Sequence, residues 1–364
     1  MSDSKSPAAP QTRSFTTGGQ GEVDGAGGTD IMERYRPEFE SALRATLEGP
    51  NLPLYDMVRY HMGWQDAEGN PTDAPGKTLR PMLCLLAAEV VGGDFRIALP
   101  AAVSVELMHN FSLIHDDIQD EDWQRRGRDT VWKVWGKPQA INAGDLLWAI
   151  ANRNLARAGS AGWPAETVAT ALDSLNYAAV RMIEGQYLDI RYEGVFKIDL
   201  DAYQEMTMRK TGALFGCAME LGALAAGASL EHSLRFRKCG EKLGVGFQVH
   251  DDVLGIWGDS AQTGKSHDND IIRRKKTLPF IHGYANVDAE GAQVLGHYIM
   301  YPENDPPVKK IRAAFERAGS REYAAELAGR LVREAFTELD GLPLAADGLA
   351  ELRLLAARLV SRQS

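Results

Sequence analysis

The sequence predicts an all-α fold with one large domain, and three observations support this prediction. Over most of the chain, apolar residues recur three and four positions apart, the spacing of one helix face, as at Phe39, Leu43 and Leu47. Alternating Val, Ile and Thr with hairpin turns, the pattern of strands, is almost absent. Clusters of Gly, Pro, Asp and Asn separate the helical stretches, at 49–53, 69–76, 92–94, 127–129, 136–138, 159–164, 258–265 and 302–307.

The N-terminal segment differs from the rest of the chain. Residues 1–30 are mostly Ser, Gly, Pro, Thr and Ala, with almost no large apolar side chains to offset the entropy of an ordered chain. We therefore expect a disordered segment at 1–30 and a helical domain at 31–364. Further along the chain, Leu83, Leu86, Ala87 and Val90 show the same helical spacing.

Composition and charge exclude several classes of protein. Hydrophobic residues make up 44% of the 364 residues and charged residues 25%, which rules out a fibrous or wholly disordered chain. The net charge of −10 argues against bulk attraction to nucleic acid or to an anionic membrane. Any phosphate bound by this protein must therefore be held by local basic residues or by metal ions.

The cysteines and the most apolar stretch bear on the compartment. The three cysteines are far apart and outside any CxxC motif, which fits a reducing cytoplasm; they are Cys84, Cys217 and Cys239. The N-terminus lacks the pattern of a secretory signal. Residues 214–230 carry one charge, Glu220, but they are rich in Ala and Gly and just short of a spanning length, so we expect a buried helix and no transmembrane segment.

Two acidic clusters carry the first chemical signal. On a helix, Asp116 and Asp120 share a face with Asp117 beside them, and apolar neighbours draw this helix inward. Asp251 and Asp252 lie in a similar apolar stretch, so the His-Asp-Asp pattern occurs twice. Clustered carboxylates repel one another unless a cation lies among them, and Mg²⁺ prefers such oxygen ligands. The alternatives are a solvated acidic face for the first cluster and a helix C-terminus for the second.

Basic residues along the chain supply candidate anion ligands. Each alone is most simply a solvated surface group, but together, in an acidic protein, they predict two diphosphate sites, one bridged by metal and one held directly. The basic residues are Lys77, Arg80, Arg125, Arg126, Lys210, Lys265, Arg273, Arg274, Lys275 and Lys276, with His109 two turns before Asp116.

These motifs, in this order, resemble the trans-isoprenyl diphosphate synthases (polyprenyl synthetases). The resemblance covers residues 32–279, with a weaker helical remainder. It rests on an ordered series of motifs: GKTLRP at 76–81, Glu106 to His109, DDIQD at 116–120, RRG at 125–127, GQYLD at 185–189, KTG at 210–212, GFQVHDD at 246–252, TGK at 263–265 and KKTLP at 275–279.

The resemblance implies a fold, a reaction and a role for each matching residue. The fold is a bundle of long antiparallel helices around a deep central cavity, commonly a homodimer. Isopentenyl diphosphate condenses with an allylic diphosphate to form a short all-trans product. About three magnesium ions take part. The implied metal ligands are Asp116, Asp117, Asp120 and Asp251, with Asp252 in support. The allylic diphosphate would contact Arg125, Lys210, Lys275 and Lys265, and isopentenyl diphosphate would contact Lys77, Arg80, His109 and Arg126. Thr211, Gln248 and Gln186 would line the cationic centre.

This sequence departs from the family pattern at two places. Pro75 and Thr78 stand in a motif that usually reads Gly-Gly-Lys-Arg, although the spacing from Lys77 to Arg80 is kept. Gly255 replaces the usual last Asp of the second acidic motif. We hypothesise that this smaller ligand set weakens metal affinity without abolishing catalysis.

The product length is expected to depend on the residues below the first acidic motif. Phe111 lies five residues before Asp116, about 7.5 Å along a helix, and Met108 lies close to a turn further. Phe111 is followed by Ser112 and not by a second aromatic residue. This combination resembles the pattern of geranylgeranyl diphosphate synthases. Alternatively, Phe111 is a core residue and the product is farnesyl diphosphate.

Three other interpretations remain at this point. A class I terpene synthase would not need the second basic set, which contains Lys77, Arg80, His109 and Arg126. A non-catalytic subunit of a heteromeric synthase usually has an eroded first acidic motif, which is intact here. A plain helical metal-binding or scaffold protein would require the basic motifs to be coincidental.

Overall fold

The computed structural model describes residues 27–72, 76, 78–193, 195, 197–258, 269–301 and 303–361. Lys77 and Lys265, two of the expected substrate-binding residues, lie outside this part of the chain, as does most of the segment 1–30. Helix α1 begins at Gly27, before the expected domain boundary at residue 31.

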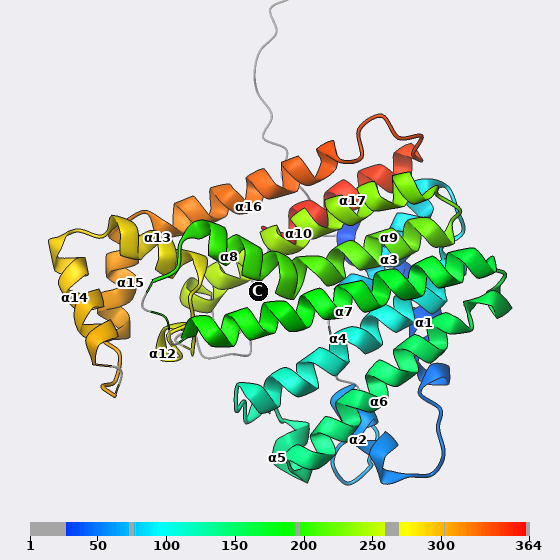
Figure 1. Ribbon diagram of the computed structural model, residues 1–364, viewed down its shortest axis with the longest axis horizontal. Coiled ribbons are helices and arrows are strands. Elements are labelled where there is room, and N and C mark those ends of the chain that lie inside the picture. Colours follow the sequence, from blue (N-terminus) through cyan, green and yellow to red (C-terminus); the bar gives the residue numbers. More distant parts are fainter. Residues whose placement is uncertain are drawn as a thin grey trace, which may run out of the picture.

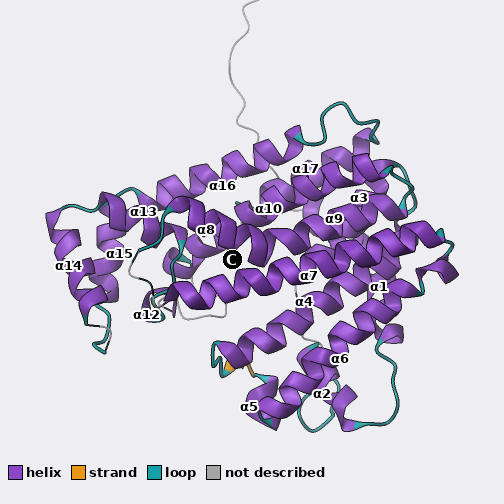
Figure 2. Cartoon of the chain, viewed as in Figure 1, coloured by secondary structure: helices purple, strands orange, loops and turns teal. Residues whose placement is uncertain are grey.

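Helices make up nearly all the regular structure of the described residues, so the all-α prediction is confirmed (Figure 2). In chain order the α-helices are α1 (Gly27–Thr46), α2 (Pro53–His61), α3 (Leu79–Val91), α4 (Leu99–Gln119), α5 (Val131–Trp135), α6 (Lys137–Ala156), α7 (Ala165–Glu193), α8 (Leu200–Thr207), α9 (Ala213–Ala225), α10 (Leu230–Trp257), α12 (Asn269–Ile272), α13 (Leu278–Asn286), α14 (Ala289–Met300), α15 (Val308–Arg317), α16 (Ser320–Thr337) and α17 (Ala346–Leu359). The short helices are the 3-10 turns η1 (Phe95–Ala98) and η2 (Ala158–Ala161) and the π-turn η3 (Met208–Gly212). Strands β1 (Gln124–Arg125) and β2 (Arg128–Asp129) form one antiparallel hairpin.

The helices that carry the acidic motifs, α4 and α10, lie inside the bundle (Figure 1). Helix α10 packs against α9 and α16, while α4 packs against α6 and α3. Helix α9 contacts both α4 and α10 and so joins the two halves of the core. Helices α13, α14 and α15 form one end of the molecule around a separate apolar cluster of Ile256, Ile271, Phe280, Leu295, Tyr298, Ile311 and Phe315.

Most of the Ala- and Gly-rich stretch forms α9, which is buried along its whole length, as expected. The expected helix ran to residue 230, but α9 ends at Ala225, and Leu230 is exposed at the start of α10. Gly222 permits close packing, because a Cβ there would lie 2.0 Å from the carbonyl oxygen of Cys84 on α3. The one charged side chain, Glu220, is 1% exposed and accepts hydrogen bonds from Arg237 Nε at 2.6 Å and Ser174 Oγ at 3.0 Å. Because an isolated charge in this interior would be costly, the pairing explains how α9 tolerates a carboxylate in the core.

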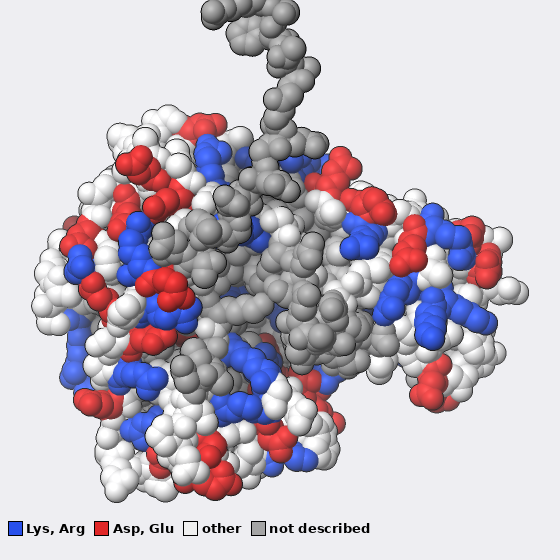
Figure 3. Space-filling model, turned by 180° about the vertical axis from the view of Figure 1, so that it is seen from behind, with Lys and Arg blue, Asp and Glu red and all other residues white. Residues whose placement is uncertain are grey.

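Within the described residues, a different helical stretch has the length and composition of a membrane span. It covers Phe95–Gln119, and 67% of its most apolar window is buried inside the protein. A mostly buried helix of this kind is typical of a protein core. On the described surface seen in Figure 3, basic and acidic side chains are interspersed.

Candidate active site

The first acidic motif lies where α4 ends. The N–H of Asp120 donates to the carbonyl of Asp116 at 2.8 Å, and Glu121 then turns the chain with a positive φ of 53°. Asp116 and Asp120 are half-buried, whereas Asp117 is buried. Burial raises the pKa of Asp116 to about 6; Lys210 opposes this shift and Asp120 adds to it. Carboxylates that resist ionisation in this way favour a bound cation.

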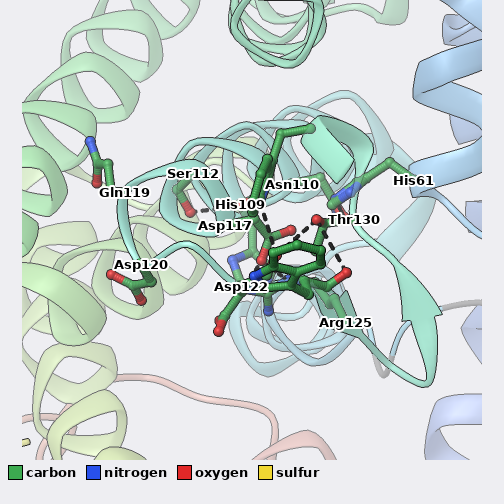
Figure 4. A network of polar contacts seen from close by, with 12 residues as sticks. His61, His109, Asn110, Ser112, Asp117, Gln119, Asp120, Asp122, Arg125 and Thr130 are labelled. Carbon is green, nitrogen blue, oxygen red and sulfur yellow. Dashed lines mark hydrogen bonds and ion pairs between the residues drawn. The ribbon is translucent and has the colours of Figure 1, made fainter. Parts of the chain in front are cut away.

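Asp117 forms an ion pair with Arg125. Its Oδ1 accepts from both Nε and Nη2 of Arg125, each at 2.7 Å. The β1–β2 hairpin turns at Arg126 and Gly127, both with positive φ, and this turn brings Arg125 back toward α4. Figure 4 shows Asp117 and Arg125 in one group of side chains, with Asp120 pointing away from it.

The two carboxylates of the second motif have different surroundings. Asp251 is half-buried, whereas Asp252 is 5% exposed. Asp252 Oδ2 accepts from Tyr203 Oη at 2.7 Å and from the Leu278 N–H at 2.9 Å, and its Oδ1 accepts from Gln248 Nε2 at 3.0 Å. Burial raises the pKa of Asp252 to about 7, although these hydrogen bonds oppose the shift. Both oxygens of Asp252 are therefore occupied by protein donors.

Gly255, one turn after Asp251 on α10, lies against α12. A Cβ at this glycine would lie 2.0 Å from Oδ2 of Asp270. Helix α12 is anchored by Tyr298, whose Oη donates to the Ile271 carbonyl at 2.6 Å. A carboxylate from another helix thus occupies the space where the side chain of the usual third Asp would begin.

Lys210 and Thr211 lie in the π-turn η3, a feature common at functional sites. A Cβ on Gly185 would lie 2.2 Å from the backbone nitrogen of Lys210, so a glycine is required for α7 to pack against this turn. Lys210 Nζ contacts Asp189 Oδ2 at 2.5 Å. Burial lowers the pKa of Lys210, but the Asp189 carboxylate helps to outweigh this and raise it. Thr211 Oγ1 donates to Gln248 Oε1 at 3.0 Å.

Three residues expected to bind isopentenyl diphosphate belong to the described part of the chain. Arg80 Nη1 lies 3.1 Å from His109 Nε2, and its guanidinium lies over the Phe215 ring, 4.7 Å from the centroid. Burial lowers the pKa of His109 well below its ordinary value, and the charge of Arg80 lowers it further, which favours the neutral imidazole. A Cβ on Gly76 would lie 2.6 Å from Arg126 Nη1, so Arg126 is next to the residue that precedes Lys77.

Two further expected residues lie close to the end of α4. Lys275 Nζ is 3.9 Å from Asp120 Oδ2. Gln186 Nε2 donates to Gln119 Oε1 at 3.1 Å, while the buried Oε1 of Gln186 has no hydrogen-bond partner among the described residues. Lys275 therefore borders the first acidic motif, and Gln186 contacts the end of α4.

Of the residues expected to limit product length, Phe111 and Met108 are buried on α4, whereas Ser112 is half-buried. Phe111 is 8% exposed and makes an edge contact with His115, with ring centroids 4.9 Å apart. Met108 is fully buried in the same apolar cluster. Ser112 Oγ donates to the His109 carbonyl at 2.8 Å. Their role in product length stays a prediction.

Sequence reasoning did not single out three side chains of this site: Asp189, Tyr203 and Asp270. The sequence signal for Asp189 is that an acidic residue ends the GQYLD motif. Tyr203 gave no comparable signal, because its partner Asp252 is 49 positions away on another helix. Asp270 follows the break at 258–265 and becomes informative only when its carboxylate is seen against Gly255.

The donors fit magnesium held jointly with a substrate. In the described ranges, no group of three or more His, Cys, Asp or Glu side chains is arranged to hold a metal ion unaided. Hard carboxylate oxygens on two helices nevertheless suit Mg²⁺, which takes one or two carboxylates and completes its coordination with phosphate oxygens and water.

Comparisons with known proteins agree with this arrangement. The polyprenyl synthetase family model matches residues 66–317. The geranylgeranyl diphosphate synthase of Mycobacterium tuberculosis (strain ATCC 25618 / H37Rv) is 36% identical over 335 residues, which are 91% of this chain and 94% of that protein. The (2E,6E)-farnesyl diphosphate synthase of Mycobacterium bovis (strain ATCC BAA-935 / AF2122/97) is 36% identical over 313 residues, 85% of this chain and 86% of that protein. The crystal structure of a polyprenyl synthetase from Streptomyces coelicolor A3(2) matches with a TM-score of 0.84 at 38% identity, over 91% of this chain and 99% of that one. The expected resemblance and enzyme class are confirmed, and the chain belongs to the polyprenyl synthetase family, a family of prenyltransferases.

Proposed function

We propose that this chain is a magnesium-dependent trans-prenyltransferase that condenses isopentenyl diphosphate with an allylic diphosphate to give geranylgeranyl diphosphate. The observation that carries the proposal is the pairing of acidic and basic side chains at the end of α4, Asp117 with Arg125 and Asp120 with Lys275. Alternating charges of this kind suit a diphosphate bridged by metal ions on one side and bound by guanidinium and ammonium groups on the other.

The acidic residues would hold about three magnesium ions, as the family resemblance implies. The ligands would be Asp116, Asp117, Asp120 and Asp251, with Asp252 in support. When bound, the ions neutralise charge on the leaving diphosphate. We propose that Asp270 adds the carboxylate that Gly255 lacks, in place of the smaller ligand set inferred from sequence. Its support is the 2.0 Å approach of the Asp270 carboxylate to the Cβ position of Gly255.

The basic residues would divide between the two substrates. Arg125, Lys210, Lys275 and Lys265 would bind the allylic diphosphate, and Lys77, Arg80, His109 and Arg126 would bind isopentenyl diphosphate. The neutral state of His109 suits a role as a hydrogen-bonding group beside the Arg80 guanidinium, because a second charge so close would repel it.

The neutral polar residues would stabilise the carbocation that forms when the allylic C–O bond breaks. Thr211, Gln248 and Gln186 offer dipoles without a nucleophilic charge, which limits capture of the cation. The apolar core around them excludes water and so protects the cation from hydrolysis. The isopentenyl double bond then attacks, and the proton lost afterwards passes to the released diphosphate.

The length of the product would depend on Phe111 and Met108. Both side chains are buried on α4 below Asp116, where a growing prenyl tail would extend. The Phe111 ring lies about 7.5 Å along the helix from Asp116, where it would block further growth of the tail. We therefore propose a twenty-carbon product.

We also propose that the enzyme is a homodimer formed through α6 and α7. Seven exposed apolar side chains lie on these neighbouring helices, at spacings of three, four and seven residues that keep them on one face: Ile141, Trp148, Tyr177, Val180, Ile183, Tyr187 and Ile190. An apolar face of this extent is typical of an interface, and a second copy offers the same face in return.

The compartment that we propose is the cytoplasm. Its support is that all three cysteines are free thiols buried in the core, Cys84, Cys217 and Cys239. Burial raises the pKa of the Cys239 thiol to about 12, which keeps it protonated and unreactive.

The reaction is tested by incubating the purified chain with labelled isopentenyl diphosphate and dimethylallyl diphosphate, with Mg²⁺ or EDTA. We expect incorporation of the label into an allylic product only with Mg²⁺, and loss of this activity in Lys210→Ala. Hydrocarbon formed without isopentenyl diphosphate would instead identify a terpene synthase. No turnover at all would indicate a non-catalytic subunit.

A further inference from the structure

A continuous chain of buried and partly buried hydrogen bonds runs from α8 to the π-turn. It joins Tyr203, Asp252, Gln248 and Thr211, with contacts of 2.7, 3.0 and 3.0 Å. We propose that Asp252 is a positioning residue that fixes which end of the Gln248 side-chain amide faces Thr211. This inference rests on the proposed function, because it assigns Gln248 and Thr211 to the carbocation site.

The donors around Asp252 define its role. The backbone N–H of Leu278 can only donate, so Oδ2 of Asp252 must accept. The amide nitrogen of Gln248 donates to Oδ1, the other oxygen. An ionised Asp252 can only accept at Oδ1, so the amide nitrogen of Gln248, and not its oxygen, faces this oxygen. The orientation of Gln248 is therefore set by the geometry of three helices, α8, α10 and α13.

The orientation of Gln248 in turn determines the hydroxyl of Thr211. With Nε2 directed at Asp252, Oε1 of Gln248 faces Thr211, and an amide oxygen can only accept. The Thr211 hydroxyl must then donate to Oε1 of Gln248. The remaining lone pairs of Thr211 Oγ1 and Gln248 Oε1 are therefore available to face a developing cation. A reversed amide would direct N–H groups toward Thr211 and free its O–H to point elsewhere, which presents positive ends of dipoles to a developing cation.

Asp252 therefore differs in kind from its neighbour Asp251. Both oxygens of Asp252 already accept from protein donors on α8, α10 and α13, and the side chain is 5% exposed. On this account Asp252 supports the site through Gln248 and does not coordinate the metal, which is a narrower role than the one the family resemblance implied.

The test compares three variants. In Asp252→Asn, the N–H of Leu278 still requires an oxygen, so the new amide group must turn its NH₂ toward Gln248 and reverse the Gln248 amide. We expect kcat to fall about 100-fold, as for loss of one oriented dipole at a charged transition state. KM for both diphosphates should stay within about threefold, because ground-state binding is untouched. Gln248→Glu alone should also be impaired, because two carboxylates then face each other.

The double variant Asp252→Asn/Gln248→Glu provides the rescue. A carboxylate at position 248 accepts from the new amide at 252 and from Thr211. The hydrogen bond between positions 252 and 248 then runs opposite to the wild type, but Thr211 again donates to residue 248 as it does in the wild type. We expect it to recover at least about tenfold in kcat over either single variant. A merely structural role would give additive losses and no recovery. If Asp252→Asn cannot be purified, Gln248→Glu against the double variant still decides the question.

Mn²⁺ binding, followed by electron paramagnetic resonance with inorganic diphosphate present, separates positioning from coordination. We expect Asp252→Asn to match the wild type and Asp251→Asn to bind Mn²⁺ about tenfold more weakly. The proposal would be overturned if Asp252→Asn weakened Mn²⁺ binding as much as Asp251→Asn does. It would also be overturned if Asp252→Asn kept the wild-type kcat, or if the double variant recovered no activity. An inactive wild type would overturn the proposed function itself, so the two failures are distinguishable.

Discussion

The carboxylate of Asp270 lies where a side chain at Gly255 would begin, with Oδ2 2.0 Å from the Cβ position. Gly255 is one turn after Asp251 on α10, so a carboxylate at this place faces the same side of the helix as Asp251. The local sequence of α10 lacks the third acidic residue, yet a carboxylate from α12 occupies its space. A side chain at position 255 and the Asp270 carboxylate therefore cannot occupy this space at the same time.

The contact between Asp270 and Gly255 predicts how substitutions at these two positions change Mn²⁺ binding. Asp270→Asn should weaken Mn²⁺ binding about tenfold, and Gly255→Ala should do the same because its methyl group displaces Asp270. Gly255→Asp should not strengthen binding, since the two carboxylates would collide. The double variant Gly255→Asp/Asp270→Gly should restore affinity, measured by electron paramagnetic resonance with diphosphate. Glu290→Gln, an exposed residue on α14, is the control. Wild-type affinity in Asp270→Asn would contradict the assignment.

Phe111→Ala is expected to lengthen the product beyond twenty carbons, because it removes the ring below Asp116. The variant should lose about 3–5 kcal/mol of unfolding free energy as a buried aromatic truncation, so assays belong at low temperature. Phe315→Ala is the matched control: its ring is also buried but lies in the separate cluster of α13, α14 and α15. An unchanged product distribution in Phe111→Ala would exclude this ring as the limit.

The stability of the metal-free enzyme should depend on pH through Asp116. Its folded pKa of about 6 lies above the ordinary 3.8, so ionisation of Asp116 destabilises the fold as the pH rises through this range. Asp116→Asn removes that cost. We measure the free energy of unfolding with urea in the presence of EDTA. Between pH 4 and pH 7 this free energy should increase for the variant relative to the wild type by about 1–3 kcal/mol. Mg²⁺ with diphosphate should reverse the order, and a difference independent of pH would contradict the prediction.

A charge on the exposed face of α7 should dissociate the dimer. Ile183 is 56% exposed in the middle of the apolar face, and Ile183→Glu would bury a carboxylate in the proposed interface. We expect a monomer by analytical ultracentrifugation at micromolar concentration. Leu230→Glu, an equally exposed position on α10, should leave the mass unchanged. A monomeric wild type would contradict the proposed interface.

The fold class followed from local patterns, whereas several contacts of the site depend on tertiary packing. Helical periodicity suffices to predict α10, which buries residues at spacings of three and four, such as Phe236, Cys239 and Leu243. Helix α4 is buried on all sides between Ala101 and Met108, so its sequence there is a long apolar run. Asp117 is buried within α4, whereas Asp120 is the C-cap residue where the helix ends, so the two carboxylates have different surroundings. No sequence pattern relates Tyr203 to Asp252, because the contact joins α8 to α10.

The second acidic motif shows the same limit more clearly. Its sequence indicates one carboxylate fewer than usual, and only the packing of α12 against α10 brings Asp270 into the gap at Gly255. The pKa of Asp116 is a similar case, since burial among neighbouring helices sets it and a linear motif carries no measure of burial.

The proposed function is tested most directly by sizing the product made by the purified enzyme. Isopentenyl diphosphate would be supplied with dimethylallyl, geranyl or farnesyl diphosphate, with Mg²⁺ or EDTA, and the dephosphorylated products separated by chain length. We expect elongation only with Mg²⁺ and a stop at twenty carbons from every primer. A stop at fifteen carbons would contradict the role of Phe111, and no elongation from any primer would contradict the proposed function.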